Sequence, residues 1–301
     1  MCFMCMSIRY NTAMKCYLCP RACGADREAG ELGFCRCPAL PHVARAARHD
    51  WEEPCLSGTR GSGAVFFSGC NLGCVYCQNR EISREIKGKP LDAVGLREVF
   101  LRLRDTGVHN LNLVTPTPYA RVIAEALEQP IGIPVVWNCG GYESIDTLRM
   151  LEGKVDIWLP DMKYAEEAPA RALSAAPDYF ARADEAIREM FRQTGPYVLD
   201  GDGLLTRGVL VRHLVLPGYL SSSKGVLEWF SDTFGRGKAL LSLMAQYTPN
   251  GSGGPDRSLT EAEYGEVRDY LYMLGIRDGY LQEPGAAAGA YVPAFDGTGV
   301  E

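Results

Sequence analysis

The stretch Cys70-Asn-Leu-Gly-Cys74-Val-Tyr-Cys77 directly follows a short apolar run at residues 64–67. It puts three cysteines at positions i, i+4 and i+7 of one short loop, so that their thiolates can bind three of the irons of a cubane cluster. Four cysteine ligands would close such a cluster for electron transfer. Three leave one iron open, the feature that separates catalytic from structural metal sites. The loop therefore predicts that Cys70, Cys74 and Cys77 are metal ligands with a catalytic role.

An open iron can chelate the amino and carboxylate groups of S-adenosylmethionine. The reduced cluster can then give one electron to the sulfonium and release a 5′-deoxyadenosyl radical. The alternative is a zinc site that is completed by Cys139, Cys55 or a histidine. Zinc sites of this kind usually pair two close Cys-x2-Cys units, which the loop does not offer. The spacing therefore favours a [4Fe-4S] cluster.

Most of the cysteines are clustered, since eleven of the twelve lie before residue 78 of the 301. Disulfide frameworks belong to small secreted domains, whereas this chain can bury its own core and residues 1–11 do not resemble a signal peptide. Metal ligation in a cytoplasmic protein is the expected use. A formal net charge of -6 argues against a nucleic-acid surface. The absence of any apolar run near the roughly 18 residues of a bilayer span argues against a membrane protein.

A second group, Cys16-x2-Cys19-x3-Cys23-x11-Cys35, supplies four further thiolates. Four thiolates complete either a closed iron–sulfur cluster or a structural zinc site, and the sequence leaves both open. Cys37 is an alternative to Cys35 as the fourth ligand. Cys2 and Cys5 are expected to be incidental.

The chain beyond Gly61 alternates between strand-like and helix-like patterns. Short, continuously apolar runs are typical of strands that are buried on both faces of a parallel sheet. The predicted strands are 64–67, 111–114, 134–137, 155–159, 209–216 and 239–244, and the predicted helices are 92–104, 119–127, 144–151, 177–193 and 258–274. We therefore predict an α/β fold with a cysteine-rich metal-binding segment at 1–60, a central parallel sheet at 61–250, and a C-terminal helix and tail at 251–301.

The last of these parts has two local signals. Ser258 and Glu261 stand at the spacing of a capping box for the final helix. The Gly- and Ala-rich tail after residue 283 is expected to be ordered only if Tyr291 and Phe295 dock on the rest of the protein.

In its cysteine loop and in the order of its later motifs, the chain resembles the radical S-adenosylmethionine superfamily. Within this superfamily it is most similar to an uncharacterised branch that is related to the pyruvate formate-lyase activating enzymes. The resemblance covers residues 16–250 and implies a partial (β/α)6 barrel. It also implies an oxidoreductase that abstracts hydrogen, with a reductant such as flavodoxin or ferredoxin and a protein substrate. The residues that the resemblance assigns to the cofactor site are Tyr76, Asn138, Asp161 and Lys163 in Asp161-Met-Lys163, Arg212 in Val-Arg-His-Leu-Val-Leu-Pro-Gly, and Gln246.

Most of these positions also make physical sense without the resemblance, because the carboxyl ends of parallel strands are where α/β folds build their sites. Arg212 offers a planar fork for a carboxylate, and Lys163 a compact cation. The alternatives are a loop turn for Asp161, a surface ion pair for Arg212 and plain packing for Tyr76. His213 should point to the opposite face of its strand from Arg212 and is expected to be structural.

One stretch departs from the family pattern. Activating enzymes carry Gly-Gly-Glu after the second strand, where this chain has Val114-Thr-Pro-Thr-Pro118. The hydroxyls of Thr115 and Thr117 can accept hydrogen bonds from an ammonium group, but the glutamate is missing, and Asn138 stands in place of an acid. A glycyl-radical activase is thus one candidate function. The non-enzymatic alternative is an iron–sulfur or zinc scaffold or electron carrier.

Overall fold

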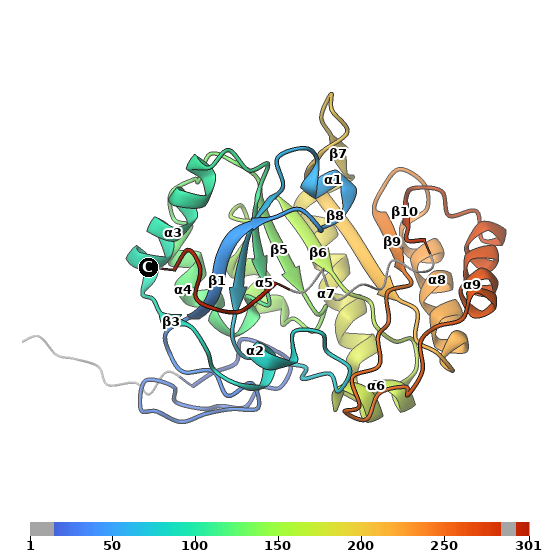
Figure 1. Cartoon of the computed structure of the whole chain (residues 1–301), viewed down its shortest axis with the longest axis horizontal. Helices are drawn as coiled ribbons and strands as arrows, with labels where there is room; N and C mark the ends of the chain where they lie inside the picture. Colours follow the sequence, from blue (N-terminus) through green and yellow to red (C-terminus); the bar gives the residue numbers. More distant parts are fainter. Residues whose placement is uncertain (1–14, 284–292, 301) are drawn as a thin grey trace, which may run out of the picture.

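The computed structural model describes residues 15–283 and 293–300, so that Cys2, Cys5 and Tyr291 lie outside the described residues. A ten-stranded sheet forms the centre of the molecule, in the order β10-β9-β8-β6-β5-β4-β2-β1-β3, with β7 paired to β8 (Figure 1). The parallel strands are β2 (Ser62–Phe67), β4 (Leu111–Val114), β5 (Val135–Cys139), β6 (Ile157–Pro160), β8 (Leu205–Leu214), β9 (Leu240–Met244) and β10 (Gly279–Leu281). The antiparallel strands are β1 (His42–His49), β3 (Lys89–Pro90) and β7 (Val198–Leu199).

Helices lie between successive parallel strands, as parallel pairing requires. They are α2 (Arg80–Arg84), α3 (Ala93–Asp105), the 3-10 helix η1 (Thr117–Tyr119), α4 (Ala120–Ala126), α5 (Ile145–Met150), α6 (Glu167–Ser174), α7 (Tyr179–Thr194), α8 (Leu220–Phe234) and α9 (Glu261–Met273). The short helix α1 (Pro54–Ser57) lies between the antiparallel strands β1 and β2. The α/β architecture with a mostly parallel central sheet is therefore confirmed. None of the helices within the described ranges is long and apolar enough to cross a bilayer.

The six predicted strands correspond to β2, β4, β5, β6, β8 and β9, and most of the residues of these strands are buried. Four strands were not predicted, among them the two-residue strands β3 and β7. The strand β1 carries two arginines among its alanines and pairs with β2 across the predicted boundary at residue 60. The strand β10 has three residues, too few for a pattern. The division into three parts stays a prediction.

The helix predictions differ from the structure in two ways. No helix was predicted for α1, α2, α6 or α8. In α8, three consecutive serines, at 221–223, interrupt the apolar pattern. The predicted capping box at Ser258 and Glu261 is wrong. Thr260 is the N-cap of α9, and its side chain and that of Glu263 bond each other's backbone N–H. The true pair therefore lies two residues further along, and α9 begins later than expected.

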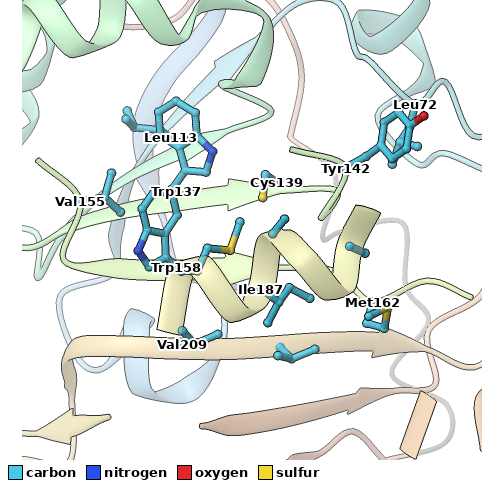
Figure 2. Close-up of a cluster of buried hydrophobic side chains, with 14 of the residues drawn as sticks. Leu72, Leu113, Trp137, Cys139, Tyr142, Val155, Trp158, Met162, Ile187 and Val209 are labelled. Atoms are coloured by element: carbon cyan, nitrogen blue, oxygen red, sulfur yellow. The ribbon is translucent and has the colours of Figure 1, made fainter. Parts of the chain in front are cut away.

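Opposite faces of the sheet pack against different helices. Trp137 and Trp158 meet edge to face, with ring centroids 6.2 Å apart, in the core that Ile187 of α7 completes (Figure 2). On the other face, Leu56 of α1 packs into a second cluster that includes Val136 of β5. Side chains two residues apart in a strand point to the same face, so the face against which α1 packs also carries the polar residues described below.

The C-terminal residues 293–300 run along β1. The N–H of Gly297 donates to the Ala44 carbonyl at 2.9 Å, and the N–H of Ala46 donates to the Thr298 carbonyl at 2.9 Å. Phe295 packs edge to face on Phe66, with centroids 5.5 Å apart. This part of the tail is therefore attached to the sheet, with Phe295 docked.

Candidate active site

The carboxyl ends of the parallel strands surround a cavity of about 240 Å³. Because these ends meet at one edge of a parallel sheet, residues that are far apart in the sequence converge there. The predicted residues that line the cavity are Cys70, Cys74, Tyr76, Cys77, Thr115, Asn138, Asp161, Lys163, Arg212 and Gln246. Cys139 also lines the cavity, whereas Cys55 lies in the cluster around Leu56 of α1.

Thr117 does not join this group. It is buried in η1, and its hydroxyl donates to Glu143 Oε1 at 2.7 Å. The prediction that Thr117 contacts a cofactor with Thr115 is therefore not reproduced by the geometry, because the turn after β4 directs the two threonines to different places. Thr115 itself has a left-handed backbone, with φ of 59°, and its N–H donates to the Asn138 carbonyl.

Arg212 is the centre of a buried ionic network. Its Nε donates to Asp161 Oδ1 at 2.9 Å, and its Nη2 donates to Asn138 Oδ1 at 2.6 Å. Its Nη1 donates to Glu52 Oε1 at 3.2 Å. Lys163 Nζ donates to Asp161 Oδ2 at 2.6 Å. The strand residue Arg212 therefore makes an ion pair inside the cavity rather than on the surface, and its network occupies three of its five N–H donors.

Charge pairing sets the protonation of this network. Burial favours the neutral form of Asp161, but Arg212 and Lys163 outweigh it and hold the pKa of that carboxyl below its ordinary value. Burial opposes the charged form of Lys163 as well, yet the Asp161 carboxylate raises the pKa of the amine well above its ordinary value. The three groups therefore stay charged at neutral pH and present a fixed pattern to a ligand.

Glu52 was not predicted. Its carboxylate accepts hydrogen bonds from Asn112 and from Asn138 Nδ2, the latter at 3.1 Å, in addition to its ion pair with Arg212. It comes from the segment just before α1, together with the cavity residues His49 and Trp51. The only sequence signal is an acidic pair, Glu52 and Glu53, before a proline, and nothing local points to a strand edge that lies 160 residues further on.

His213, the neighbour of Arg212, points away from the cavity as predicted. It is buried between the Met162 carbonyl, at 2.7 Å, and the Ser223 hydroxyl, at 2.9 Å. Burial lowers the pKa of His213 to about 4, so the ring is neutral at pH 7. It is a structural residue.

The cysteine loop follows β2 directly. Cys74 Sγ accepts a hydrogen bond from the Ser174 hydroxyl at 2.9 Å, and Cys70 Sγ accepts one from the Leu72 N–H at 3.4 Å. Burial and the neighbouring cysteines raise the pKa of Cys77 to about 12. The Cys77 thiol would therefore release a proton on ligating a metal.

The donor set fits an iron–sulfur cluster. Within residues 15–283 and 293–300, no three or more histidine, cysteine, aspartate or glutamate side chains form a group that could hold one metal ion. Cys70, Cys74 and Cys77 line one cavity, and these three thiolates would hold an iron–sulfur cluster there.

The second cysteine group lies in a tight turn. The N–H of Cys16 donates to the Ala25 carbonyl, and the N–H of Gly24 donates back to the Cys16 carbonyl, both at 3.0 Å. Cys16 is close enough to Cys23 and Cys35 for their charges to raise the pKa of its thiol, although burial raises that pKa most.

Cys37 is fully buried, and its thiol lies between the Cys35 carbonyl, at 3.4 Å, and the Ser68 carbonyl, at 3.6 Å. Cys35 Sγ accepts a hydrogen bond from Arg27 Nη2 at 3.3 Å. Cys35 and Cys37 therefore adjoin each other, and both stay candidates for the fourth ligand.

Comparisons with known proteins give few close relatives. No family model matches the chain. The chain is 29% identical, over 255 residues, to an uncharacterized protein of Methanocaldococcus jannaschii, a match that covers 81% of this chain and 69% of that protein. The crystal structure of Streptococcus suis SuiB bound to the precursor peptide SuiA matches with a TM-score of 0.50 at 11% identity, over 71% of this chain. Methylornithine synthase (PylB) matches with a TM-score of 0.46 at 16% identity, over 73% of this chain and 70% of that one. This chain spans about half of SuiB, 46% of its length.

Proposed function

We propose that the chain is a radical S-adenosylmethionine enzyme, on the ground of its relationship in fold to that superfamily. Cys70, Cys74 and Cys77 would hold a [4Fe-4S] cluster. Such a cluster supplies an electron to the sulfonium of S-adenosylmethionine and so generates a radical that abstracts hydrogen. The observation that carries the proposal is that the three cysteines share one cavity with the strand-end residues Asp161 and Arg212.

The residues of the cavity have separate tasks in this proposal. Arg212 keeps two N–H donors outside its own network, which suits a carboxylate ligand. Lys163 adds positive charge, and Asp161 and Asn138 keep Arg212 in position. Tyr76 closes one side, where its hydroxyl accepts from Tyr164 at 2.8 Å.

The proposal extends to the fold and the substrate. The six strands β2, β4, β5, β6, β8 and β9 would form the partial (β/α)6 barrel. SuiB was crystallised with a precursor peptide, which supports a protein or peptide substrate here, of the kind a glycyl-radical activase modifies. The enzyme would take its electron from a reductant such as flavodoxin or ferredoxin. The N-terminal cysteines Cys16, Cys19, Cys23 and Cys35 would hold a second [4Fe-4S] cluster or zinc.

The test is 5′-deoxyadenosine formation by the anaerobically reconstituted protein with S-adenosylmethionine and a strong reductant. We expect the wild type to form it and Cys74→Ala to lose at least about 100-fold, because one cluster ligand and its place in the cavity are gone. Cys55→Ala is the matched control: this buried cysteine lies outside the cavity, so its variant should keep the activity.

The alternative, a scaffold or electron carrier, gives a different result. Its cluster would show the same spectrum with and without S-adenosylmethionine, and no 5′-deoxyadenosine would form. A polar, charged cavity beside the cysteines is not needed by a carrier. Product formation that survives in Cys74→Ala would exclude the proposed role of the loop.

A further inference from the structure

Arg21 lies between Cys19 and Cys23 in the second cysteine group, yet its guanidinium is bonded to other parts of the chain. Its Nε donates to the Asn71 carbonyl at 2.9 Å, and its Nη2 reaches the Leu72 carbonyl at 3.5 Å, both in the three-cysteine loop. The same guanidinium packs over the ring of Phe34, 3.9 Å from its centroid. One side chain of the N-terminal group thus holds the loop that carries Cys70 and Cys74.

The other N–H groups of Arg21 bind the end of helix α6. Its Nη2 donates to the Ser174 carbonyl at 3.1 Å, and its Nη1 donates to the Ala175 carbonyl at 2.5 Å. Ala175 ends the helix in the left-handed conformation, with φ of 49°. Carbonyls at a helix C-terminus lack intrahelical partners, so a cation that binds them fixes the position of the last turn.

The contacts of Arg21 with the three-cysteine loop and with the end of α6 lie on either side of one hydrogen bond. Ser174, 1% exposed, donates from its hydroxyl to Cys74 Sγ at 2.9 Å. Tyr164 lies within hydrogen-bond distance of the same hydroxyl, at 2.7 Å, and donates to Tyr76. Arg21 therefore holds the backbone on both sides of the Ser174–Cys74 contact, the donor side through α6 and the acceptor side through the loop.

We propose that Arg21 is a positioning residue that fixes the Ser174–Cys74 hydrogen bond and thereby couples the N-terminal cysteine group to the reduction potential of the cluster in the three-cysteine loop. The inference rests on the proposed function. A hydrogen bond to a ligand sulfur stabilises the more negative, reduced cluster and raises its potential. Ligation of Cys19 and Cys23 fixes the turn that carries Arg21, so loss of the N-terminal metal releases the same hydrogen bond.

The experiment is an EPR-monitored redox titration of the loop cluster, without S-adenosylmethionine, in Arg21→Gln, Ser174→Ala and the double variant. Each single variant should lower the midpoint potential by about 59 mV, which is a roughly tenfold change in the equilibrium constant for one-electron reduction. Because both act through one hydrogen bond, the double variant should shift no further than either single one. Cys19→Ser should give the same shift. Arg171→Gln, which removes an exposed arginine of α6, is the control and should leave the potential unchanged.

The outcomes separate this inference from the proposed function. If the wild-type protein assembles no cluster at Cys70, Cys74 and Cys77, this result would contradict the proposed function itself. An intact wild-type cluster, with an unshifted potential in Arg21→Gln or additive shifts in the double variant, would overturn the role of Arg21 alone. If Arg21→Gln is not stably folded, Arg21→Lys takes its place. Its ammonium lacks the planar fork that spans these carbonyls, so it too should lower the potential, and an unshifted Arg21→Lys would overturn the inference.

Discussion

Arg212→Met is expected to lower the free energy of unfolding by about 3–5 kcal/mol, because it leaves the carboxylates of Asp161 and Glu52 without their buried partner. Methionine fills much of the space but donates no hydrogen bond. The measurement is chemical denaturation at pH 7 for the wild type and the variant. Lys163 remains bonded to Asp161 and limits the loss on that side.

Arg171→Met is the matched control for this prediction. Arg171 and Glu167 form an exposed ion pair on α6, with 64% and 63% of their side chains exposed. Such a pair contributes at most about 0.5 kcal/mol. A second variant, Glu52→Gln combined with Arg212→Met, should recover part of the loss, because the Glu52 carboxylate, whose ion pair is with Arg212, is then replaced by a neutral amide. Equal losses in Arg212→Met and Arg171→Met would show that the cavity network is solvated and carries no more energy than a surface pair.

This network is the part of the site that local sequence could reveal only incompletely. Asp161, Lys163 and Arg212 follow or lie in strands with clear apolar patterns, so their convergence follows from the topology of a parallel sheet. Glu52 reaches the same cavity from an irregular segment, and its position depends on how α1 packs against the sheet. Its role therefore depends on tertiary packing, which no periodicity or spacing in the sequence indicates.

The same distinction applies to the cysteines. The i, i+4, i+7 spacing of the loop places three ligands within eight residues, so it can be interpreted without a structure. The proposed role of Arg21 cannot be predicted from the sequence, because its partners Asn71 and Ser174 are 50 and 153 residues away. The two threonines show the converse case. Thr115 and Thr117 are two positions apart and look equivalent in the sequence, but Thr115 lines the cavity whereas Thr117 lies in η1.

Glu53→Gln is expected to change how stability depends on pH. Burial raises the pKa of Glu53 to about 7, with Glu52 adding to the effect and Arg212 opposing it, whereas its ordinary value is 4.5. Between these two pH values the folded protein keeps a proton that the unfolded chain has released. The contribution of Glu53 is thus fully present below pH 4.5 and is lost as the pH rises through 7. The loss amounts to at most about 3 kcal/mol, from about 1.36 kcal/mol per unit of pKa.

The measurement must be a difference, because other buried groups titrate in the same range. Burial raises the pKa of Glu143 to about 7 and gives a loss in the same direction, whereas the lowered pKa of His213 gives a gain between about pH 4 and its ordinary value of 6.5. Subtracting the free energy of unfolding of Glu53→Gln from that of the wild type at each pH cancels both. The difference should fall between pH 5 and pH 8. A flat difference would mean that the Glu53 carboxyl is hydrated in the folded protein.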